Sequence, residues 1–334
     1  MKKIAINGLG RIGRLVLRQY LMGNYPDLEI IAANDLTPAA DIAYLMRYDS
    51  VHGKPPFTVE SAEDYLRFDS KEIKFFSKKD PAELPWESLG VDIVLECTGL
   101  FRKREDAAKH LEAGAGRVII SAPSKSADLT VVMGVNEDLY DPEKHQIISN
   151  ASCTTNSLAP ALKILNDAFE IESALITTIH AYTASQAMVD GPARKRRRGR
   201  AAAVSLIPTS TGSAIATALV LPELEGKMDA IAVRAPIPDG AITDIVACVR
   251  KEVSVESINA EFKKAVHGKL QGILDFTEDE IVSADIIGDP HSGIVDGSFT
   301  RVVNDKLIKV LVWYDNEFGY SVRMLDLAAY MAKK

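Results

Sequence analysis

The feature that most constrains the fold of this chain is a glycine-rich hexamer near its start. Gly8-Leu9-Gly10-Arg11-Ile12-Gly13 follows a β-rich run, Lys3–Asn7, and precedes a stretch with helical spacing, Arg14–Gly23. Glycines at such a turn let the backbone approach a pyrophosphate, which the free N–H groups of the helix N-terminus attract. Asp35 ends the next apolar run, where a carboxylate can accept from both ribose hydroxyls and repels a 2′-phosphate. This context predicts a dinucleotide site, and the alternative is a purely structural strand-to-helix turn.

The first 150 residues alternate short apolar runs with helical patterns. The later runs are Leu28–Ala33, Asp92–Cys97, Val118–Ser121, Val131–Met133 and Gln146–Ser149, and a helical stretch covers Arg104–Ala113. Fully apolar strands separated by helices indicate a parallel sheet covered on both faces. We therefore expect a Rossmann-type, doubly wound α/β domain over residues 1–152.

After about residue 150 the pattern changes to alternating strands with fewer helices. Helices are expected at Thr154–Ala168 and Ser257–Gly268, strands at Ser173–Thr183, Ala230–Ala235 and Ala241–Val253, and a hairpin at Val295–Val303 and Leu307–Trp313 around Asn304-Asp305. The alternation of apolar and polar residues is typical of antiparallel strands. The Asn-Asp dipeptide is typical of a hairpin turn. These patterns predict a second, mixed α+β domain over residues 153–316 and a closing helix within residues 317–334.

Composition narrows the function classes. The 334 residues include 39 basic and 46 acidic side chains, a net charge of −7, which argues against a protein that mainly holds nucleic acid or an anionic membrane. The three cysteines contain no C-x-x-C pair, so neither a disulfide framework nor a cysteine zinc site is indicated. No apolar run has the length of a signal peptide or a membrane span. We expect a cytoplasmic protein without a metal.

A candidate nucleophile lies in Ser152-Cys153-Thr154-Thr155-Asn156, between a strand and a helix. A cysteine at a helix N-terminus feels the positive end of the dipole, which lowers the thiol pKa and favours the nucleophilic thiolate. The alternative is a buried, inert thiol. His180 ends an apolar strand, where it can pair with the thiolate and later take a proton from a substrate hydroxyl. Cys97 and Cys248 lie in apolar patterns and are interpreted as core, and the other five histidines as solvated or structurally satisfied.

Small hydroxyl residues and an arginine give a third, weaker signal. They are Thr183, Thr209-Ser210-Thr211-Gly212 and Arg234. Hydroxyls and N–H groups at a glycine-containing turn, together with a guanidinium, suit a phosphate oxyanion. Each is nonspecific alone, because Ser-Thr-Gly turns are usually only turns.

Further motifs run in order from end to end of the chain. They are Asn7–Arg14 with the glycine loop, Asn34-Asp35, Tyr48–Gly53, Cys97-Thr98-Gly99, Ala151–Asn156, His180–Thr183, Leu221–Leu224 with Gly226-Lys227, and Trp313–Glu317 with Gly319-Tyr320-Ser321. Together they resemble the phosphorylating glyceraldehyde-3-phosphate dehydrogenases. The motif around Cys153 is very specific, so chance or mere fold sharing is a poor explanation.

The resemblance implies a glycolytic and gluconeogenic enzyme that converts D-glyceraldehyde 3-phosphate to 1,3-bisphosphoglycerate through a cysteine thioester, with NAD and inorganic phosphate. It makes Cys153 the nucleophile and His180 its activating base. The implied cofactor contacts are Gly8, Gly10, Arg11, Ile12, Gly13, Asp35, Lys79, Ser121 and Asn316. The implied contacts to the substrate phosphate and to inorganic phosphate are Ser152, Thr154, Thr183, Thr211, Gly212 and Arg234. Asp35, Leu36 and Pro192 match the NAD-using pattern of that family.

The resemblance also implies a homotetramer in which the loop Val189–Arg200 lines a subunit interface and the neighbouring cofactor site, and a last helix that returns to the nucleotide domain. The sequence departs from the family at three places. Ser157 stands where a second cysteine is frequent, Lys79 where an arginine usually touches the adenine side, and the loop is more basic at Arg196 and Arg197.

Two alternatives remain open at this stage. The close relative erythrose-4-phosphate dehydrogenase shares the cysteine motif but tends to lack the pair that stands here as Tyr182-Thr183, and a threonine there can hold inorganic phosphate. A nucleic-acid-binding secondary role could use the basic run 194–200. That run lacks interleaved aromatic residues for base stacking, and the chain is acidic overall, so both features count against this role.

Overall fold

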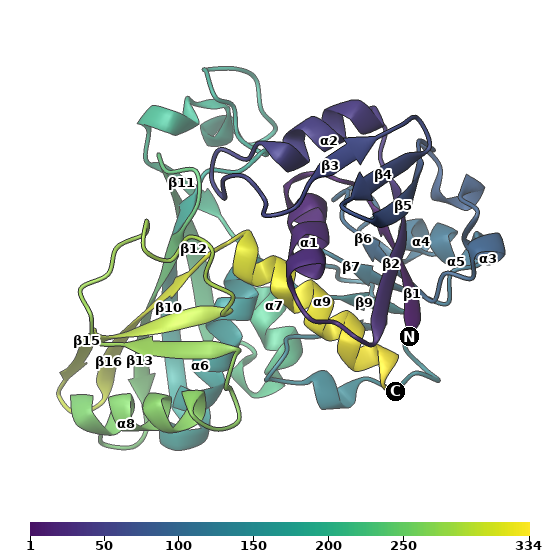
Figure 1. The fold of residues 1–334 in the computed structure, drawn as a ribbon. Coiled ribbons are helices and arrows are strands. Elements are labelled where there is room, and N and C mark those ends of the chain that lie inside the picture. The colour runs from purple at the N-terminus through teal and green to yellow at the C-terminus, as the bar shows by residue number, and fades with distance from the viewer. The chain divides into compact units, whose positions relative to one another are not determined.

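The computed structural model describes residues 1–334, which divide into two compact units. The first unit comprises Met1–Ala151 and Ser321–Lys334, and the second comprises Ser152–Tyr320. The C-terminal segment thus belongs to the same unit as the N-terminal segment. In Figure 1 the C-terminal helix is yellow and the N-terminal strand and helix are purple.

The first unit is built on a nine-stranded sheet in the order β3-β4-β5-β2-β1-β6-β7-β9-β8. Its strands are β1 (Lys2–Asn7), β2 (Leu28–Asn34), β3 (Val59–Ser61), β4 (Tyr65–Phe68), β5 (Lys71–Phe76), β6 (Ile93–Glu96), β7 (Arg117–Ile120), β8 (Leu129–Thr130) and β9 (Ile147–Ser149). The strands from β5 to β8 pair in parallel, whereas β3–β4 and β4–β5 pair antiparallel. From β1 the chain first adds β2 to β5 on one side of the sheet and then adds β6 to β9 on the other side. The strand order therefore reverses between β1 and β6, which is the topological switch point of a doubly wound fold.

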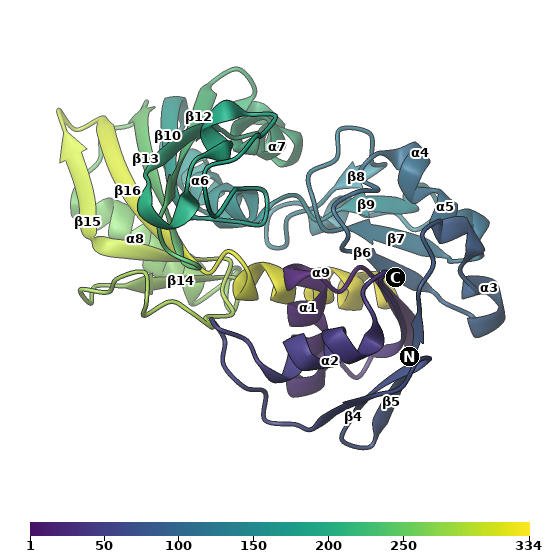
Figure 2. The same ribbon diagram turned by 90° about the horizontal axis from the view of Figure 1, so that it is seen from above.

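Helices cover both faces of this sheet. They are α1 (Arg11–Met22), α2 (Ala39–Arg47), α3 (Trp86–Leu89), α4 (Arg104–Ala107), α5 (Lys109–Glu112) and α9 (Phe318–Ala332), with short 3-10 turns η1 (Pro81–Glu83) and η2 (Glu137–Leu139). Figures 1 and 2 show α1 and α9 on one side of the sheet and α4 and α5 on the other. Because both faces are covered, successive residues of β1, from Ile4 to Ile6, are all fully buried.

The second unit is a seven-stranded mixed sheet in the order β11-β12-β10-β13-β16-β15-β14. Its strands are β10 (Ile171–Ala181), β11 (Ile207–Ser210), β12 (Met228–Ala235), β13 (Ala241–Val249), β14 (Leu274–Thr277), β15 (Gly293–Val303) and β16 (Leu307–Tyr314). Its helices are α6 (Cys153–Phe169), α7 (Ser213–Val220) and α8 (Val255–Val266), with 3-10 turns η3 (Arg196–Gly199), η4 (Ala202–Val204) and η5 (Pro222–Leu224). Helices α6 and α8 contact each other and both pack on β15, so they cover the same side of the sheet (Figure 1).

Helix α8 shows how local sequence and packing agree in this unit. Ser254 caps its N-terminus in a reciprocal capping box with Ser257, which satisfies two backbone donors. Ile258, Phe262 and Val266 recur every four residues, and all three are buried. The apolar stripe therefore faces the sheet, while the rest of the helix meets solvent.

The expected fold class, a Rossmann-type α/β domain followed by a mixed α+β domain, is confirmed. Several details differ. Strands β10 and β12 pair in parallel rather than antiparallel, because the chain returns through a crossover that contains α7. The antiparallel β3–β5 edge was not expected, and Val131–Met133 forms no strand. The stretch expected as one helix from Arg104 to Ala113 is two short helices, α4 and α5.

Two cysteines also differ from the expectation. Cys97 and Cys248 are partly exposed rather than fully buried. Cys97 follows the last residue of β6, where the strand gives way to a loop, and Cys248 lies on the less buried face of β13. None of the helices combines the length and the apolar character that a membrane-spanning helix needs.

Candidate active site

A pocket of about 640 Å³ lies at the carboxyl ends of the central strands of the first unit. Its lining residues are Asn7, Gly8, Gly10, Asn34, Asp35, Leu36, Lys78, Lys79, Asp80, Glu83, Cys97, Thr98, Leu100, Phe101 and Lys109. This is the switch-point position at which open α/β sheets bind ligands. The sequence-predicted contacts Gly8, Gly10, Asp35 and Lys79 meet in this one pocket.

The glycine loop leaves room for a ligand at one point and is closely packed at two others. Gly8 has a φ of +93°, and an added Cβ there would lie 2.7 Å from the backbone nitrogen of Thr98. An added Cβ at Gly13 would collide with the carbonyl oxygen of Gly8, whereas one at Gly10 would have no atom within 4 Å. Gly8 and Gly13 are thus required by packing, and the open space over Gly10 fits a pyrophosphate beside the N-terminus of α1.

Asp35 is held at the rim of this pocket by backbone donors. The N–H of Leu9 donates to its Oδ2 at 2.6 Å, and the N–H of Thr37 donates to its Oδ1 at 2.8 Å. The carboxylate is thereby fixed next to the glycine loop, where it can accept from ribose hydroxyls.

The other predicted cofactor contacts lie elsewhere. Arg11, Ile12 and Gly13 belong to the first turns of α1 and are not part of the pocket lining, and Arg11 forms an ion pair of 2.6 Å with Asp49. Ser121 directly follows β7 and donates its N–H to the carbonyl of Glu96. Asn316 follows β16 in the second unit and is 6% exposed.

Cys153 is the first residue of α6, at the position predicted from the sequence. The hydroxyl of Ser152 caps the helix by accepting from the N–H of Thr155 at 3.1 Å. Ala151, immediately before the cap, has a φ of +54°, a left-handed conformation that is unfavourable for a residue with a Cβ. Such strain is often found where the surrounding structure fixes a functional side chain.

His180 lies beside this thiol. Its Nε2 is 3.4 Å from the Sγ of Cys153, and it occupies the end of β10 in register with Arg234 of β12. The Nδ1 of His180 lies 2.8 Å from the carbonyl oxygen of Ala181, and Nη1 of Arg234 is 2.8 Å from both that oxygen and Nδ1. The structure therefore brings a thiol, an imidazole and a guanidinium into one cluster of the second unit.

The electrostatics of this cluster differ from the expectation for the thiol. Burial raises the pKa of Cys153, and the charge of Arg234 and hydrogen bonds from Thr154 oppose that rise without cancelling it. The position at the helix N-terminus is as predicted, but desolvation outweighs it. Burial, and secondarily the charge of Arg234, lowers the pKa of His180 to about 3, so the imidazole is neutral at neutral pH.

The predicted phosphate contacts separate into two groups. The hydroxyl of Thr183 bonds that of Ser185, and Arg198 donates to the hydroxyls of Ser185 and Thr209, so these side chains gather around a second guanidinium. Arg198 was not assigned from the sequence, because it stood within a run of basic residues that gave no sign of which one faces inward.

The remaining phosphate candidates lie at helix starts. Thr211 and Gly212 directly precede α7, and Thr211 accepts from the N–H of Ser213. Ser152 is occupied as the cap of α6, and the hydroxyl of Thr154 lies 3.0 Å from that of Tyr314 in the core. Thr154 can therefore reach an anion only through its backbone N–H.

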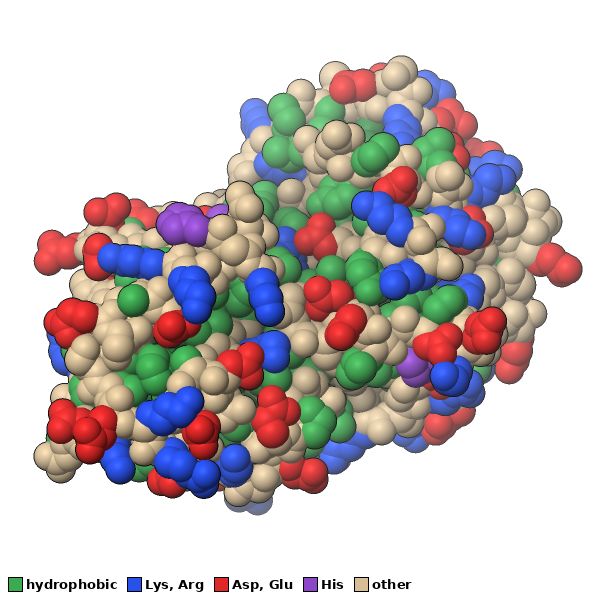
Figure 3. Space-filling model, turned by 90° about the horizontal axis from the view of Figure 1, so that it is seen from below, with side chains coloured by type: hydrophobic (Ala, Val, Ile, Leu, Met, Phe, Trp, Pro, Cys, Tyr) green, Lys and Arg blue, Asp and Glu red, His purple; other side chains and the backbone are tan.

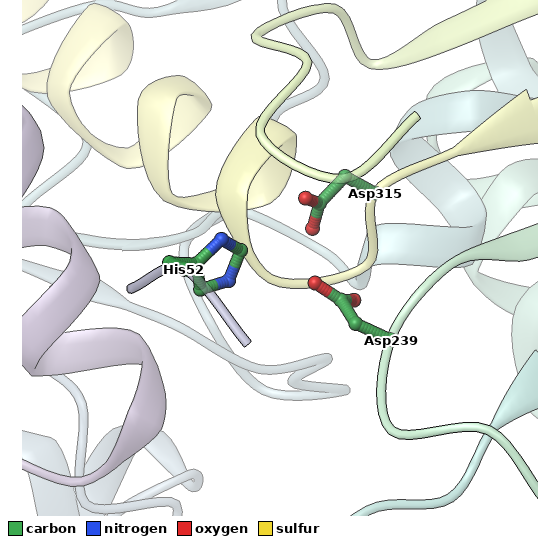
Figure 4. Close-up of side chains that lie close together, drawn as sticks. All are labelled: His52, Asp239 and Asp315. Carbon is green, nitrogen blue, oxygen red and sulfur yellow. The ribbon is translucent and has the colours of Figure 1, made fainter. Parts of the chain in front are cut away.

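Two buried carboxyl groups lie near the end of β16. Figure 4 shows Asp239 and Asp315 facing each other from two loops of the second unit, and each is 2% exposed. Asp315 accepts from the N–H groups of Gly288, Glu317 and Phe318. Burial first, and then the charges of Asp315 and Glu317, raise the pKa of Asp239 to about 9. Asp239 therefore keeps its proton at neutral pH.

Comparisons with known proteins identify the family. Residues 2–104 match the model of the glyceraldehyde 3-phosphate dehydrogenase NAD binding domain, and residues 152–316 match that of the C-terminal domain. The chain is 53% identical over 332 residues to glyceraldehyde-3-phosphate dehydrogenase of Geobacillus stearothermophilus, covering 99% of this chain and 98% of the relative. It is 53% identical to that of Thermotoga maritima, covering 100% of both chains, and 52% identical to glyceraldehyde-3-phosphate dehydrogenase 1 of Bacillus subtilis, covering 99% and 98%. The chain therefore belongs to the glyceraldehyde-3-phosphate dehydrogenase family.

Proposed function

We propose that this enzyme oxidises D-glyceraldehyde 3-phosphate to 1,3-bisphosphoglycerate, with NAD as hydride acceptor and inorganic phosphate as co-substrate, in glycolysis and gluconeogenesis. The observation that carries the proposal is the distance of 3.4 Å between Sγ of Cys153 and Nε2 of His180, in a chain of this family. The guanidinium of Arg234 lies beside this pair. A thiol next to a neutral imidazole is an arrangement suited to covalent aldehyde chemistry.

In this mechanism Cys153 passes its proton to Nε2 of His180, and Sγ then bonds to the aldehyde carbon. When the ring proton of His180 is on Nδ1, it is donated to the carbonyl of Ala181, which also accepts from Arg234, and the Nε2 lone pair faces Sγ. NAD held by Gly8, Gly10, Asp35 and Lys79 would supply the hydride acceptor for that carbon. His180 gives the thiol proton to the oxygen of the resulting thiohemiacetal and takes it back as the hydride leaves, which produces an acyl thioester on Cys153.

Inorganic phosphate then completes the reaction. A phosphate oxygen bonds to the thioester carbon, the carbon–sulfur bond breaks, and Cys153 leaves as a thiolate that recovers a proton. Arg234, Arg198 and Thr183 supply two guanidinium groups and a hydroxyl for the phosphate groups of the substrate and the attacking anion. Ser152, Thr211, Gly212 and the N–H of Thr154 are the further proposed contacts. Since Thr183 is present, phosphate attack is favoured over hydrolysis, which argues against erythrose-4-phosphate dehydrogenase activity.

We assign the first unit, including its C-terminal helix, to dinucleotide binding and the second unit to catalysis and assembly. Gly8, Gly10, Asp35 and Lys79 would hold NAD in the 640 Å³ pocket. Arg11, Ile12, Gly13 and Ser121, and Asn316 from the second unit, are the further proposed contacts. A carboxylate at Asp35 supports a preference for NAD over NADP, because it would repel a 2′-phosphate.

The sheet of the second unit supports the proposal of a homotetramer. Leu175, Ile179 and Ile231 on β10 and β12 are 68%, 42% and 52% exposed, and the first two alternate with buried residues along β10. Helices α6 and α8 cover only one face of this sheet, and apolar groups on the other face gain from burial against a second copy. Dihedral symmetry is the usual closed arrangement of four identical chains.

The basic segment 194–200 is assigned to the catalytic unit rather than to nucleic acid. Lys195 donates to Ser210 and Arg198 to Thr209, so part of the segment is committed to the neighbouring β11. The face drawn in Figure 3 is seen from below and carries interspersed basic and acidic side chains, so this face presents no extended basic surface to nucleic acid. A membrane partner is not proposed, and we place the enzyme in the cytoplasm.

The direct test of the proposed activity is steady-state kinetics with each aldehyde. Purified protein should form NADH with D-glyceraldehyde 3-phosphate only when NAD and inorganic phosphate are both present, and with erythrose 4-phosphate much more slowly. A higher kcat/KM for erythrose 4-phosphate, or turnover that is independent of phosphate, would refute the assignment.

A further inference from the structure

The last residues of three neighbouring strands form a buried polar row beneath the dinucleotide pocket. Asn7 ends β1 and is in register with Asn34 at the end of β2 and with Glu96 at the end of β6. All three residues are at most 4% exposed. They lie at the switch point of the sheet, and Asn7 and Asn34 also line the pocket. A buried carboxyl group at this place requires partners, because an unpaired one would be strongly destabilising.

One side of Glu96 is supported by a chain of donors with a defined direction. The indole Nε1 of Trp86 can only donate, and it lies 3.0 Å from Nδ1 of His110. Because Nδ1 accepts this hydrogen bond, the ring proton of His110 that faces Glu96 lies on Nε2, which donates to Oε2 of Glu96 at 3.1 Å. Trp86 and His110 are both fully buried, so no water competes for these contacts.

Asn7 connects Glu96 to the pocket rim through a chain of hydrogen bonds that crosses the sheet. Its Nδ2 donates to Oε2 of Glu96 at 2.6 Å, and its Oδ1 accepts from Nδ2 of Asn34 at 2.8 Å. Asn34 in turn exchanges hydrogen bonds with the backbone N–H and carbonyl of Lys78, another lining residue. Lys78 therefore fixes the orientation of the Asn34 amide, and Asn34 and Glu96 together fix that of the Asn7 amide.

The second oxygen of Glu96 fixes the opposite rim. Its Oε1 accepts from the N–H of Thr98 at 2.8 Å and from the Thr98 hydroxyl, which itself accepts from the N–H of Leu100. Thr98 packs so closely against Gly8 that a Cβ on Gly8 would lie 2.7 Å from its nitrogen. Glu96 therefore sets the position of the residue against which the glycine loop rests.

We infer that Glu96 is a positioning residue of the NAD site, acting through Asn7 and Thr98 on both rims of the pocket. The inference deepens the proposed function and rests on it for the identity of the ligand. Glu96 is not itself part of the pocket lining and does not contact the ligand site directly. It holds in place lining residues from β1, β2 and the turn after β6.

The inference predicts a specific effect of Glu96→Gln. Four donor groups converge on two carboxylate oxygens, from Asn7, His110 and twice from Thr98. A glutamine keeps one acceptor and turns the other into a donor, so one pair of partners faces a donor and must move. Because leaving such a buried group unsatisfied is costly, the Kd for NAD should rise about tenfold or more.

The test compares NAD binding by calorimetry with steady-state kinetics on the full-length protein. Glu96→Gln should raise Kd and KM for NAD, while kcat at saturating NAD and the alkylation rate of Cys153 without cofactor stay within about twofold of wild type. Glu112→Gln is the matched control. Glu112 is an exposed residue of α5, the helix that also carries His110, and it takes no part in the hydrogen bonds around Glu96. It should bind NAD as the wild type does.

Two further variants keep the test decisive if Glu96→Gln folds poorly. Glu96→Asp retains a carboxylate but withdraws it, and should give an intermediate Kd. The double variant Asn7→Asp with Glu96→Gln moves the carboxylate from β6 to the neighbouring strand β1. There the carboxylate can accept from the new glutamine and from Nε2 of His110, which in the wild type lies 3.3 Å from Nδ2 of Asn7. It should recover part of the lost NAD affinity, a rescue that a general loss of stability would not produce.

Equal Kd values for NAD in wild type, Glu96→Gln and Glu96→Asp would overturn the inference, as would a kcat loss with Kd unchanged. The proposed function is judged separately on the wild type. If the wild-type protein bound NAD but oxidised no triose phosphate, the proposed function would fail, and a weaker affinity in Glu96→Gln would still support the positioning role.

Discussion

Replacing Asp239 by asparagine should change how the stability of the protein depends on pH. The pKa of Asp239 in the folded protein is raised to about 9 by burial and by the charges of Asp315 and Glu317. An aspartate in the unfolded chain titrates near its ordinary, far lower pKa. The folded state therefore holds a proton that the unfolded chain releases, and its stabilising effect is complete below the ordinary pKa and is lost as pH rises towards about 9.

The size of the effect follows from linkage. One extra proton bound in the folded state lowers the unfolding free energy by about 1.4 kcal/mol per pH unit, so between pH 5 and pH 8 the wild type loses about 4 kcal/mol through this group. Asparagine at position 239 cannot ionise and still presents an N–H group to Asp315. Relative to wild type, Asp239→Asn should thus gain stability as pH rises, by about 8 °C in unfolding midpoint at 2 °C per kcal/mol.

The assay is calorimetric unfolding of wild type and Asp239→Asn at intervals between pH 5 and pH 8. Asp279→Asn serves as the matched control, because Asp279 is an exposed residue of the same unit. Its midpoint should follow that of the wild type at every pH. If the midpoints of wild type and Asp239→Asn also ran parallel, Asp239 would not hold a proton in the folded protein, and the reasoning from burial would be refuted.

Three further predictions concern the site and the assembly. His180→Asn removes the proton acceptor beside Cys153, so it should slow turnover about a hundredfold or more and also slow thiol alkylation by iodoacetamide; an unchanged alkylation rate would remove His180 from the activating role. Asp35→Gly, alone or with Pro192→Ser, should raise kcat/KM for NADP about tenfold by removing repulsion of the 2′-phosphate; equal use of NAD and NADP by the wild type would contradict this. Sedimentation velocity at micromolar concentration should show a tetramer with or without NAD, and a predominantly monomeric species would contradict the proposed interface.

The sequence predicted the parts of the fold that depend on local pattern. The glycine loop and the apolar runs at Leu28 and Gln146 gave strands and turns close to their observed bounds, because a fully covered parallel sheet requires continuous apolar strands. The parallel pairing of β10 with β12 was missed, since alternation shows that a strand is half-buried but not which neighbour it meets or in which direction. The β3–β5 edge consists of short strands with many charged residues and gave a weak signal.

The site shows the same limit. Cys153 and His180 were predicted as a pair because a cysteine at a helix start and a histidine at the end of an apolar strand suit thiol chemistry, and their Sγ and Nε2 atoms lie 3.4 Å apart. The net effect of burial on the thiol pKa depends on everything packed around it and was predicted with the wrong sign. Asn7, Asn34 and Glu96 are far apart in the sequence. That they form a row can be seen only when the register of the three strands is known.

The most direct test of the central claim is to trap the acyl group on Cys153. Protein mixed with D-glyceraldehyde 3-phosphate and NAD, without inorganic phosphate, should carry one phosphoglyceroyl group per chain by intact mass spectrometry, and peptide mapping should locate it at Cys153. Added phosphate should release the group as 1,3-bisphosphoglycerate, and Cys153→Ser should bind NAD but acquire no such mass, because a serine hydroxyl is scarcely ionised at neutral pH. An acyl group on another residue, or full turnover by Cys153→Ser, would contradict the account.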